Sequence, residues 1–212
     1  MLGSRLFAVL LCLGFSACGG APDFALTPVS SASAPGTSQV TMLVATNRRA
    51  HSGGTLFSGE RGRVLGFAEV GISIPPDSAR TVGEVQRASR GPGDPAKDFV
   101  ATKAEVLDFD RAYRRFTEML AEPRNNGRAL IFVHGYNTRF GDAVLRFAQI
   151  VHDSKVASVP VLFTWPSRGE LVAYPYDRES GNFSRDALEA ALEQLSKDSR
   201  VKQISILAHS MG

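Results

Sequence analysis

Cysteine is almost absent from this chain of 212 residues, which contains only Cys12 and Cys18. Both lie near the N-terminus, so the rest of the sequence offers no thiol for a disulfide or for a metal site. The sequence also lacks a P-loop, a G-x-G-x-x-G motif and any spaced cluster of metal ligands. We therefore expect a protein that works without a metal or another cofactor.

An excess of charge of one sign is also missing. The 24 basic and 21 acidic residues leave a formal net charge of +3, and no run of five or more basic residues occurs. This balance argues against a nucleic-acid partner. The apolar run at residues 6–15 is too short to span a bilayer as a stable helix, and no second candidate for a transmembrane segment follows.

Residues 1–17 are typical of a signal peptide. Arg5 precedes the apolar run, two small residues follow it, and Cys18 comes next. The pattern resembles a bacterial lipoprotein signal, in which the cysteine is lipidated and becomes the mature N-terminus, although Phe15 stands where leucine is usual. Secretion with cleavage nearby and an uncleaved anchor are the alternatives. We expect a domain held outside the cytoplasm, at a membrane of the bacterial cell envelope, by lipid on Cys18.

The remaining sequence divides into a linker and one domain. Residues 18–39 are rich in Ala, Ser, Pro and Gly, which predicts a flexible tether. The folded domain is expected at residues 40–212. Within it, residues 40–46 and 64–75 have the composition of strands, whereas residues 77–97 are rich in Gly, Pro and Arg and predict a surface excursion.

Helical and strand patterns alternate in the second half of the chain. Apolar residues at steps of three and four predict helices, and continuous apolar runs predict buried strands. The expected helices are residues 105–122, 141–154 and 183–199, and the expected strands are residues 129–135, 159–165 and 201–208. Such alternation favours right-handed crossovers and an α/β fold with a mostly parallel sheet and helices on both faces.

A candidate nucleophile directly follows the last predicted strand. The sequence there is Ala208-His209-Ser210-Met211-Gly212, which is similar to the nucleophile elbow G-x-S-x-G. Ala208 replaces the first glycine but is still small, and Gly212 supports the turn. We predict Ser210 as the catalytic residue, with an ordinary loop serine as the alternative. His209 is expected to pack or cap rather than react.

The segment FVHGYN, residues 132–137, ends an earlier strand and is a candidate for the oxyanion hole. Gly135 lets the backbone turn so that the N–H of Tyr136 can point at a developing oxyanion, and the N–H of Met211 is the expected second donor. His134 is expected to brace this loop rather than act as the base, because the usual chain order places the base after the serine.

These segments resemble an uncharacterised bacterial family of the α/β-hydrolase (esterase/lipase) superfamily. The resemblance lies in VHGYNTRFGDAVLRFAQIVHD, VLFTWPSRG, YPYDRESGNFS and ISILAHSMG, with weaker support from MLVATNR and GFAEVGISIPP. It covers roughly residues 40–212. It implies an α/β-hydrolase fold, a serine nucleophile at Ser210, and hydrolysis of an ester-type bond in a small-molecule or lipid-like substrate.

Aromatic and acidic residues lie between the second and third of these strands. Trp165, Tyr174 and Tyr176 are interpreted either as a wall that binds the acyl or alcohol group, or as packing under a long loop. Asp177 and Glu179 precede the serine in the chain, so neither is the expected triad acid. We interpret them as charges at the start of a helix.

The triad acid and base are expected after the serine, and the sequence stops at Gly212. We therefore expect this sequence to be the N-terminal part of a longer hydrolase, with a fold incomplete at its C-terminus. A serine hydroxyl without a base is a weak nucleophile, so the 212-residue chain is expected to be inactive alone. Two other functions stay open: a non-catalytic envelope lipoprotein that serves as a scaffold, and an acyltransferase that uses the same serine.

Overall fold

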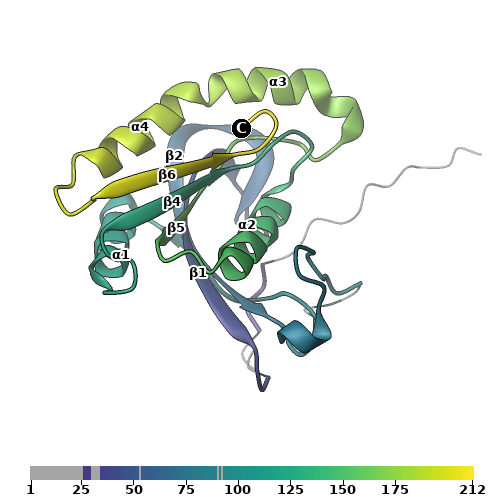
Figure 1. Cartoon of the computed structure of the whole chain (residues 1–212). Helices are drawn as coiled ribbons and strands as arrows, with labels where there is room; N and C mark the ends of the chain where they lie inside the picture. The colour runs from purple at the N-terminus through teal and green to yellow at the C-terminus, as the bar shows by residue number, and fades with distance from the viewer. Residues whose placement is uncertain (1–25, 30–33, 53, 90, 92) are drawn as a thin grey trace, which may run out of the picture.

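A mixed six-stranded β-sheet forms the centre of the computed structural model (Figure 1). The structure describes residues 26–29, 34–52, 54–89, 91 and 93–212. The strands lie in the order β3-β2-β1-β5-β4-β6. They are β1 (Ser38–Ala50), β2 (Phe57–Ile74), β3 (Val100–Leu107), β4 (Arg128–Val133), β5 (Val159–Thr164) and β6 (Gln203–Ala208).

Four of these strands run parallel. β5 pairs with both β1 and β4, and β4 pairs with β6, so that Val133 lies between Phe163 and Ala208. β2 is antiparallel to β1 and to β3, and this extends the sheet beyond the parallel part. The carboxyl ends of β1, β5, β4 and β6 therefore meet at one edge of the sheet. The predicted α/β class with a mostly parallel sheet is confirmed.

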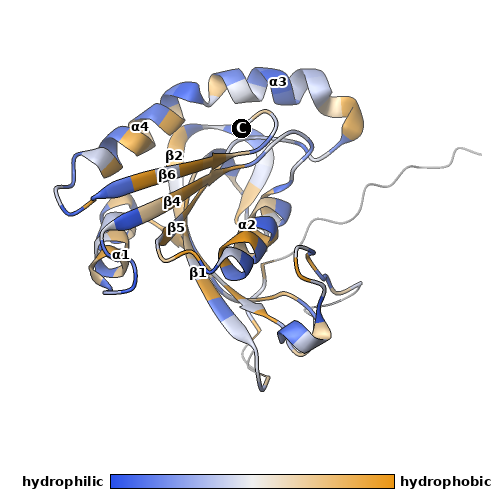
Figure 2. Cartoon of the chain, viewed as in Figure 1, coloured by the Kyte–Doolittle hydropathy of each residue, from blue (hydrophilic) through white to orange (hydrophobic). Residues whose placement is uncertain are grey.

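Helices cover both faces of the sheet, as predicted. They are α1 (Phe109–Ala121), α2 (Phe140–Ser154), α3 (Tyr174–Phe183) and α4 (Arg185–Ser196), with short 3-10 turns η1 (Asp77–Ala79) and η2 (Leu171–Ala173). α2 packs on one face, where Met42, Phe132 and Leu162 belong to its core cluster. α1 and α4 pack on the other face, where alternate strand residues such as Leu43 and Phe163 point. Figure 2 shows the apolar strands between these helices.

The predicted helix at residues 105–122 begins too early. Residues Val100–Leu107 form β3, which pairs with β2 in a register that places Leu107 opposite Phe67. α1 starts after Asp108, whose side chain accepts a hydrogen bond from the N–H of Arg111 at 2.8 Å. An N-cap of this kind satisfies a free amide of the first turn. The strand was missed because an eight-residue edge strand has too little alternation to be separated from the helix that follows.

The predicted helix at residues 183–199 is also wrong at its start. The chain is already helical in α3 from Tyr174, breaks at Ser184, and continues as α4. The two helices follow one another as a long arc beside β6 (Figure 1). Ser184 is buried, and its hydroxyl donates to the carbonyl of Ser180 at 2.7 Å while the amide of Asn47 donates to it at 2.9 Å. A contact from β1 thus holds the helix break in place.

The structure corrects part of the tether predicted for residues 18–39. Leu26 is buried in the core on the α2 side, and its N–H donates to the carbonyl of Gly54 at 3.0 Å. The N–H of Val29 donates to the carbonyl of Ala101, and β1 already begins at Ser38. These parts of the segment pack on the domain. The predicted signal peptide and Cys18 lie outside the described residues.

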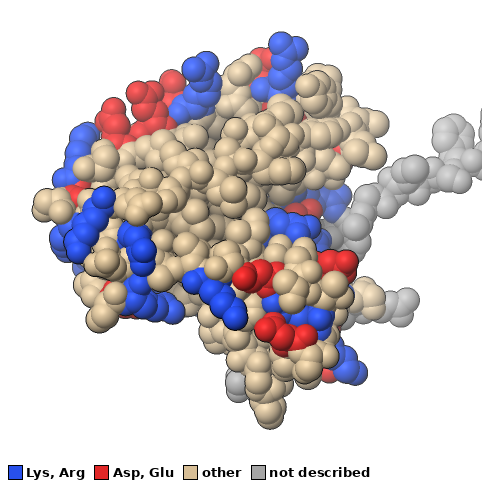
Figure 3. Space-filling view, viewed as in Figure 1, with Lys and Arg blue, Asp and Glu red and all other residues tan. Residues whose placement is uncertain are grey.

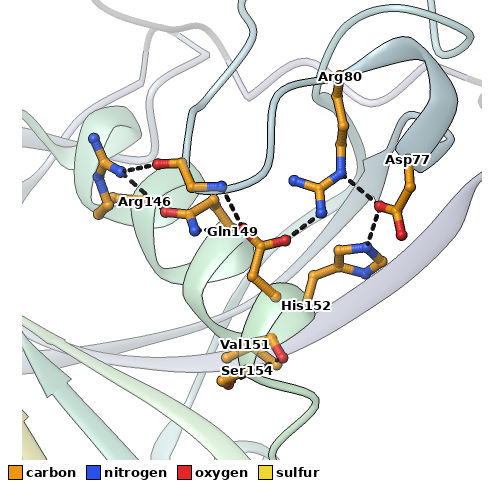
Figure 4. Close-up of polar contacts among 9 residues, drawn as sticks. Asp77, Arg80, Arg146, Gln149, Val151, His152 and Ser154 are labelled. Atoms are coloured by element: carbon orange, nitrogen blue, oxygen red, sulfur yellow. Dashed lines mark hydrogen bonds and ion pairs between the residues drawn. The ribbon is translucent and has the colours of Figure 1, made fainter.

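The segment at residues 77–97 lies over α2 and is mostly exposed, as expected of a surface excursion. Its main attachment is the buried side chain of Arg80, which forms ion pairs with Asp77 and with Asp153 of α2 (Figure 4). Gln149 and the N–H of Gly83 donate to the other oxygen of Asp153. The segment is therefore attached to α2 rather than forming an independent loop.

Two further features concern the helices and the surface of the described residues. None of their helices combines the length and the apolar character needed to cross a membrane. Figure 3 shows basic and acidic side chains interspersed on the face in view, without a broad area of one sign. That distribution agrees with the small net charge of +3.

Candidate active site

The carboxyl-terminal edge of the parallel strands brings the predicted site segments together. The loop after β4, residues 134–138, and the turn after β6, residues 209–212, are neighbours because β4 and β6 are paired. The N–H of His209 donates to the carbonyl of Val133 at 3.0 Å, which continues the ladder to the start of the turn. Sheet edges of this kind are where open α/β sheets bind ligands.

Ser210 lies at the tip of the turn after β6. Its φ is +56°, in the left-handed region that residues other than glycine rarely adopt. The residue is exposed, and the turn is closed by a hydrogen bond from the N–H of Gly212 to the carbonyl of His209 at 2.9 Å. A strained turn that exposes a serine above a sheet is the backbone feature of a nucleophile elbow. Ser210 as catalytic residue stays a prediction that this geometry supports.

Two predicted glycines allow the turn and the β4 loop to touch. A Cβ atom at Gly135 would lie 2.8 Å from Cβ of Ser210 and 2.9 Å from the carbonyl oxygen of His209. A Cβ atom at Gly212 would lie 2.5 Å from the carbonyl oxygen of Val133. Real Cβ atoms do not approach so closely, so a side chain at either position would push the nucleophile turn away from the loop.

The predicted oxyanion donors belong to these two touching segments. Within the described part of the chain, the backbone N–H groups of Tyr136 and Met211 donate to no acceptor. Free amides near a nucleophile are what an oxyanion hole requires. The Tyr136 side chain is used otherwise: its hydroxyl donates to the carbonyl of Leu171, and its ring meets the edge of Tyr174 with centroids 5.2 Å apart. The role of the two amides stays a prediction.

His134 is buried beneath the loop, and its contacts are those of a bracing residue. Nδ1 donates to the carbonyl of Gly135 at 2.8 Å, while Nε2 accepts from the N–H of Trp165 at 3.2 Å and lies 2.9 Å from Oγ1 of Thr164. Its ring stacks on Trp165, with centroids 4.8 Å apart. Burial and then the charge of Arg48 lower the pKa of His134 to about 3. The imidazole is therefore neutral at neutral pH and has both nitrogens engaged.

Asp177 is a site-bracing residue that the sequence interpretation missed. It does lie in the first turn of α3, as expected of a helix-start charge, but it is fully buried. Its carboxylate accepts from the N–H of Asn137 at 3.1 Å, the hydroxyl of Ser167 at 2.6 Å and the N–H of Arg168 at 3.0 Å. Nothing in its local sequence indicates these contacts, because the partners lie outside α3, in the segments that follow β4 and β5. Glu179 remains exposed.

Arg48 was missed for a similar reason. The sequence around it reads as a turn, but β1 continues to Ala50, and the guanidinium is buried at the end of the strand. Its Nη2 donates to the carbonyl of Thr138 at 2.8 Å, Nη1 to the carbonyl of Ser167 at 3.0 Å, and Nε to Oγ1 of Thr164 at 2.9 Å. The arginine therefore joins three of the four strand ends at this edge.

The predicted aromatic wall is not formed. Trp165 is buried against His134, and Tyr174 is exposed beside Tyr136. The ring of Tyr176 lies under the guanidinium of Arg168, whose Cζ is 4.0 Å from the ring centroid. The three rings face different surroundings, so the packing alternative holds for Trp165. The cavity nearest to the turn is instead a polar one of about 460 Å³ on the α2 side; its lining includes Gly135, Thr138, Asp142, Arg146 and His209.

Comparison with known proteins agrees with this architecture. Residues 111–212 match the family described as "Alpha/beta hydrolase of unknown function (DUF900)". This part of the chain is similar to an α/β-hydrolase family. The match begins in α1 and includes both segments that meet at the candidate active site. Searches of curated proteins and of solved structures returned no match.

The candidate site offers backbone amides, hydroxyls and charged groups. Among the residues that the structure describes, no three side chains of His, Cys, Asp or Glu converge as metal ligands would. The arrangement offers an exposed serine at a strained turn, free amides beside it and a rigid, neutral histidine below. These parts suit acyl transfer through a serine.

Proposed function

We propose that this protein is a serine hydrolase that cleaves an ester-type bond. The observation that carries the proposal is the left-handed turn at Ser210, pressed against Gly135 of the β4 loop. The match of residues 111–212 to an α/β-hydrolase family supports hydrolysis in general. The serine nucleophile and the ester substrate are the more specific part of the proposal.

In the proposed reaction, Oγ of Ser210 attacks the ester carbonyl carbon while a base accepts the hydroxyl proton. The amides of Tyr136 and Met211 stabilise the oxyanion of the tetrahedral intermediate. The intermediate collapses when the carbon–oxygen bond to the alcohol breaks and the alcohol takes the proton. Water, activated by the same base, then cleaves the acyl-serine to release the acid and restore the hydroxyl.

The proposed base is a histidine paired with a carboxylate. Neither His134 nor His152 is in a position to be this base. His134 is buried with both nitrogens engaged, and Nε2 of His152 lies 3.4 Å from Asp77, beside α2. In the described part of the chain, no histidine nitrogen contacts the hydroxyl of Ser210. The described contacts therefore do not identify the base of the proposed reaction.

Covalent labelling with a fluorophosphonate tests the proposal on the longest product of the reading frame. Oγ of an activated serine attacks phosphorus and fluoride leaves, so the label reports nucleophile and base together. We expect labelling that Ser210→Ala abolishes and that Ser205→Ala, a matched change within β6, leaves intact. Labelling of both variants alike, or of neither the wild-type protein nor the variants, would contradict a serine hydrolase and favour the scaffold function.

The proposal includes a location at the cell envelope. It rests on the apolar run and the cysteine at the N-terminus, since the domain itself has no membrane-spanning helix among its described residues. A lipid on Cys18 would place the active site close to a membrane surface, where lipid-like esters are available as substrates.

A further inference from the structure

The loop after β4 is held from two sides by buried residues of opposite charge. We propose that Arg48 and Asp177 are positioning residues that keep the N–H of Tyr136 aimed as an oxyanion donor. This inference rests on the proposed function, since it assigns a task to residues around the proposed oxyanion hole. Neither side chain contacts Ser210 among the described residues, so both act through the loop.

Ser167 joins the two charges into one cluster. Its carbonyl accepts from Nη1 of Arg48 at 3.0 Å, and its hydroxyl donates to Oδ2 of Asp177 at 2.6 Å. The same hydroxyl accepts from the N–H of Thr138 at 2.9 Å. The carbonyl of Thr138 in turn accepts from Nη2 of Arg48. The N–H and the carbonyl of Thr138, at the end of the loop, therefore both form hydrogen bonds with this cluster.

The cluster and His134 together hold the peptide groups on either side of Tyr136. The carbonyl of Gly135 accepts from His134, and the N–H of Asn137 donates to Asp177 at 3.1 Å. Asn137 has a φ of +56°, a left-handed conformation that asparagine adopts more readily than most other residues with a Cβ atom. If Asp177 released this amide, the residue could relax and rotate the peptide plane next to the N–H of Tyr136.

The burial of two charges fits a positioning role better than a role in stability alone. Arg48 is 2% exposed and Asp177 is 0% exposed, and removing such groups from water is costly even when they are well bonded. Charge-assisted hydrogen bonds are shorter and stronger than neutral ones, so they restrict the loop more tightly. Misplacement of a catalytic group by about 1 Å can lower a rate by about 100-fold.

Asp177→Asn is the main test, because it keeps the shape of the side chain and removes its charge. Glu69→Gln is the matched control. Glu69 is another buried carboxylate, bonded to Lys103 and Arg115 on the face of α1, and it makes no contact with the loop among the residues that the structure describes. The measurements are kcat and KM for p-nitrophenyl acetate, the melting temperature, and amide hydrogen exchange across residues 132–139, on the longest product of the reading frame.

We expect Asp177→Asn to lower kcat by about 10- to 100-fold while KM stays within about threefold of the wild-type value. Exchange should become faster at Asn137 and Thr138. Glu69→Gln should lower the melting temperature without changing kcat. If Asp177→Asn fails to fold, Ser167→Ala removes only the hydroxyl bridge between Asp177 and Thr138 and should produce the same pattern.

Unchanged kcat and unchanged exchange in a folded variant would overturn the inference. Failure of the proposed function is distinguishable, because the wild-type protein would then neither hydrolyse the ester nor take up the fluorophosphonate. Faster exchange confined to the loop would in that case leave Asp177 as a structural clamp and overturn its role in positioning for catalysis.

Discussion

At the scale of single residues, the candidate site contains two residues other than glycine in the left-handed backbone conformation. Ser210 and Asn137 both have a φ of +56°. The left-handed conformation costs roughly 1–2 kcal/mol for a residue such as serine, whereas asparagine adopts it more readily. Such strain persists only where neighbouring contacts hold the residue. Gly135 and Gly212 meet this need by letting the two segments touch without a clash.

His134 makes the clearest prediction about pH. Burial and the charge of Arg48 lower its pKa to about 3, from the ordinary value of 6.5 that applies in the unfolded chain. Below pH 6.5 the unfolded state binds a proton that the folded state does not, so the stability present above 6.5 is lost as pH falls. The loss should reach at most about 1.4 kcal/mol per pH unit.

Urea unfolding between about pH 7 and pH 5 measures this loss, because the carboxylates with lowered pKa have ordinary values of 4.5 or below and contribute little there. His134→Gln removes the titrating group, so we expect a less stable protein with a flatter dependence on pH. Equal slopes in the variant and the wild-type protein would show that His134 is not held neutral in the folded state.

At the scale of elements, the break between α3 and α4 shows how a contact with the sheet determines where helices begin. The residues on both sides of Ser184 are helical, and the tie to Asn47 on β1 holds the break over the sheet. α3 is thereby placed so that Asp177 on its first turn reaches the β4 loop. A substitution at Ser184 should therefore also affect the position of Asp177 at the β4 loop.

Ser184→Ala should lower the free energy of unfolding by about 1–3 kcal/mol, because it leaves the buried amide of Asn47 without its partner. Urea denaturation provides the measurement. Ser196→Ala is the matched control, since this exposed serine at the end of α4 also bonds a carbonyl of its own helix. It should cost less than about 0.5 kcal/mol, and equal losses in both variants would contradict the role of the contact with Asn47.

At the scale of the whole molecule, the domain is a sheet between two apolar layers, with small net charge and its site at one edge. None of its described helices is long and apolar enough to cross a membrane. Leu26 packs in the core, which leaves at most seven residues, 19–25, between Cys18 and the first residue with a described core contact. The anchor that we propose would therefore hold the domain close to the membrane.

Incorporation of radiolabelled palmitate in a bacterial host tests this anchor. We expect the wild-type protein to carry the label and to sediment with membranes, and Cys18→Ser to lose both properties. Cys12→Ser is the matched control because Cys12 lies in the segment that cleavage would remove, and it should keep the label. Label retained by Cys18→Ser would rule out lipidation at this residue.

Patterns of local sequence were sufficient for much of the fold. Apolar residues spaced three or four positions apart predicted α2, and continuous apolar runs predicted β4, β5 and β6. Both patterns are local, because a helix with one buried face and a fully buried strand each require apolar residues at fixed positions along their own sequence. The elbow motif and the His-Gly pair also marked Ser210 and Gly135, since a tight turn requires small residues wherever the chain lies in space.

Arg48 and Asp177 depended on tertiary structure. Each is ordinary within its own segment, one at the end of a strand and the other in the first turn of a helix. Their partners lie about 90 and 40 positions away in the chain, at the ends of other strands. Pairing of β4 with β5 and β6 brings those strand ends to one edge of the sheet. Arg48 and Asp177 can bond the backbone of the β4 loop only after the sheet has formed.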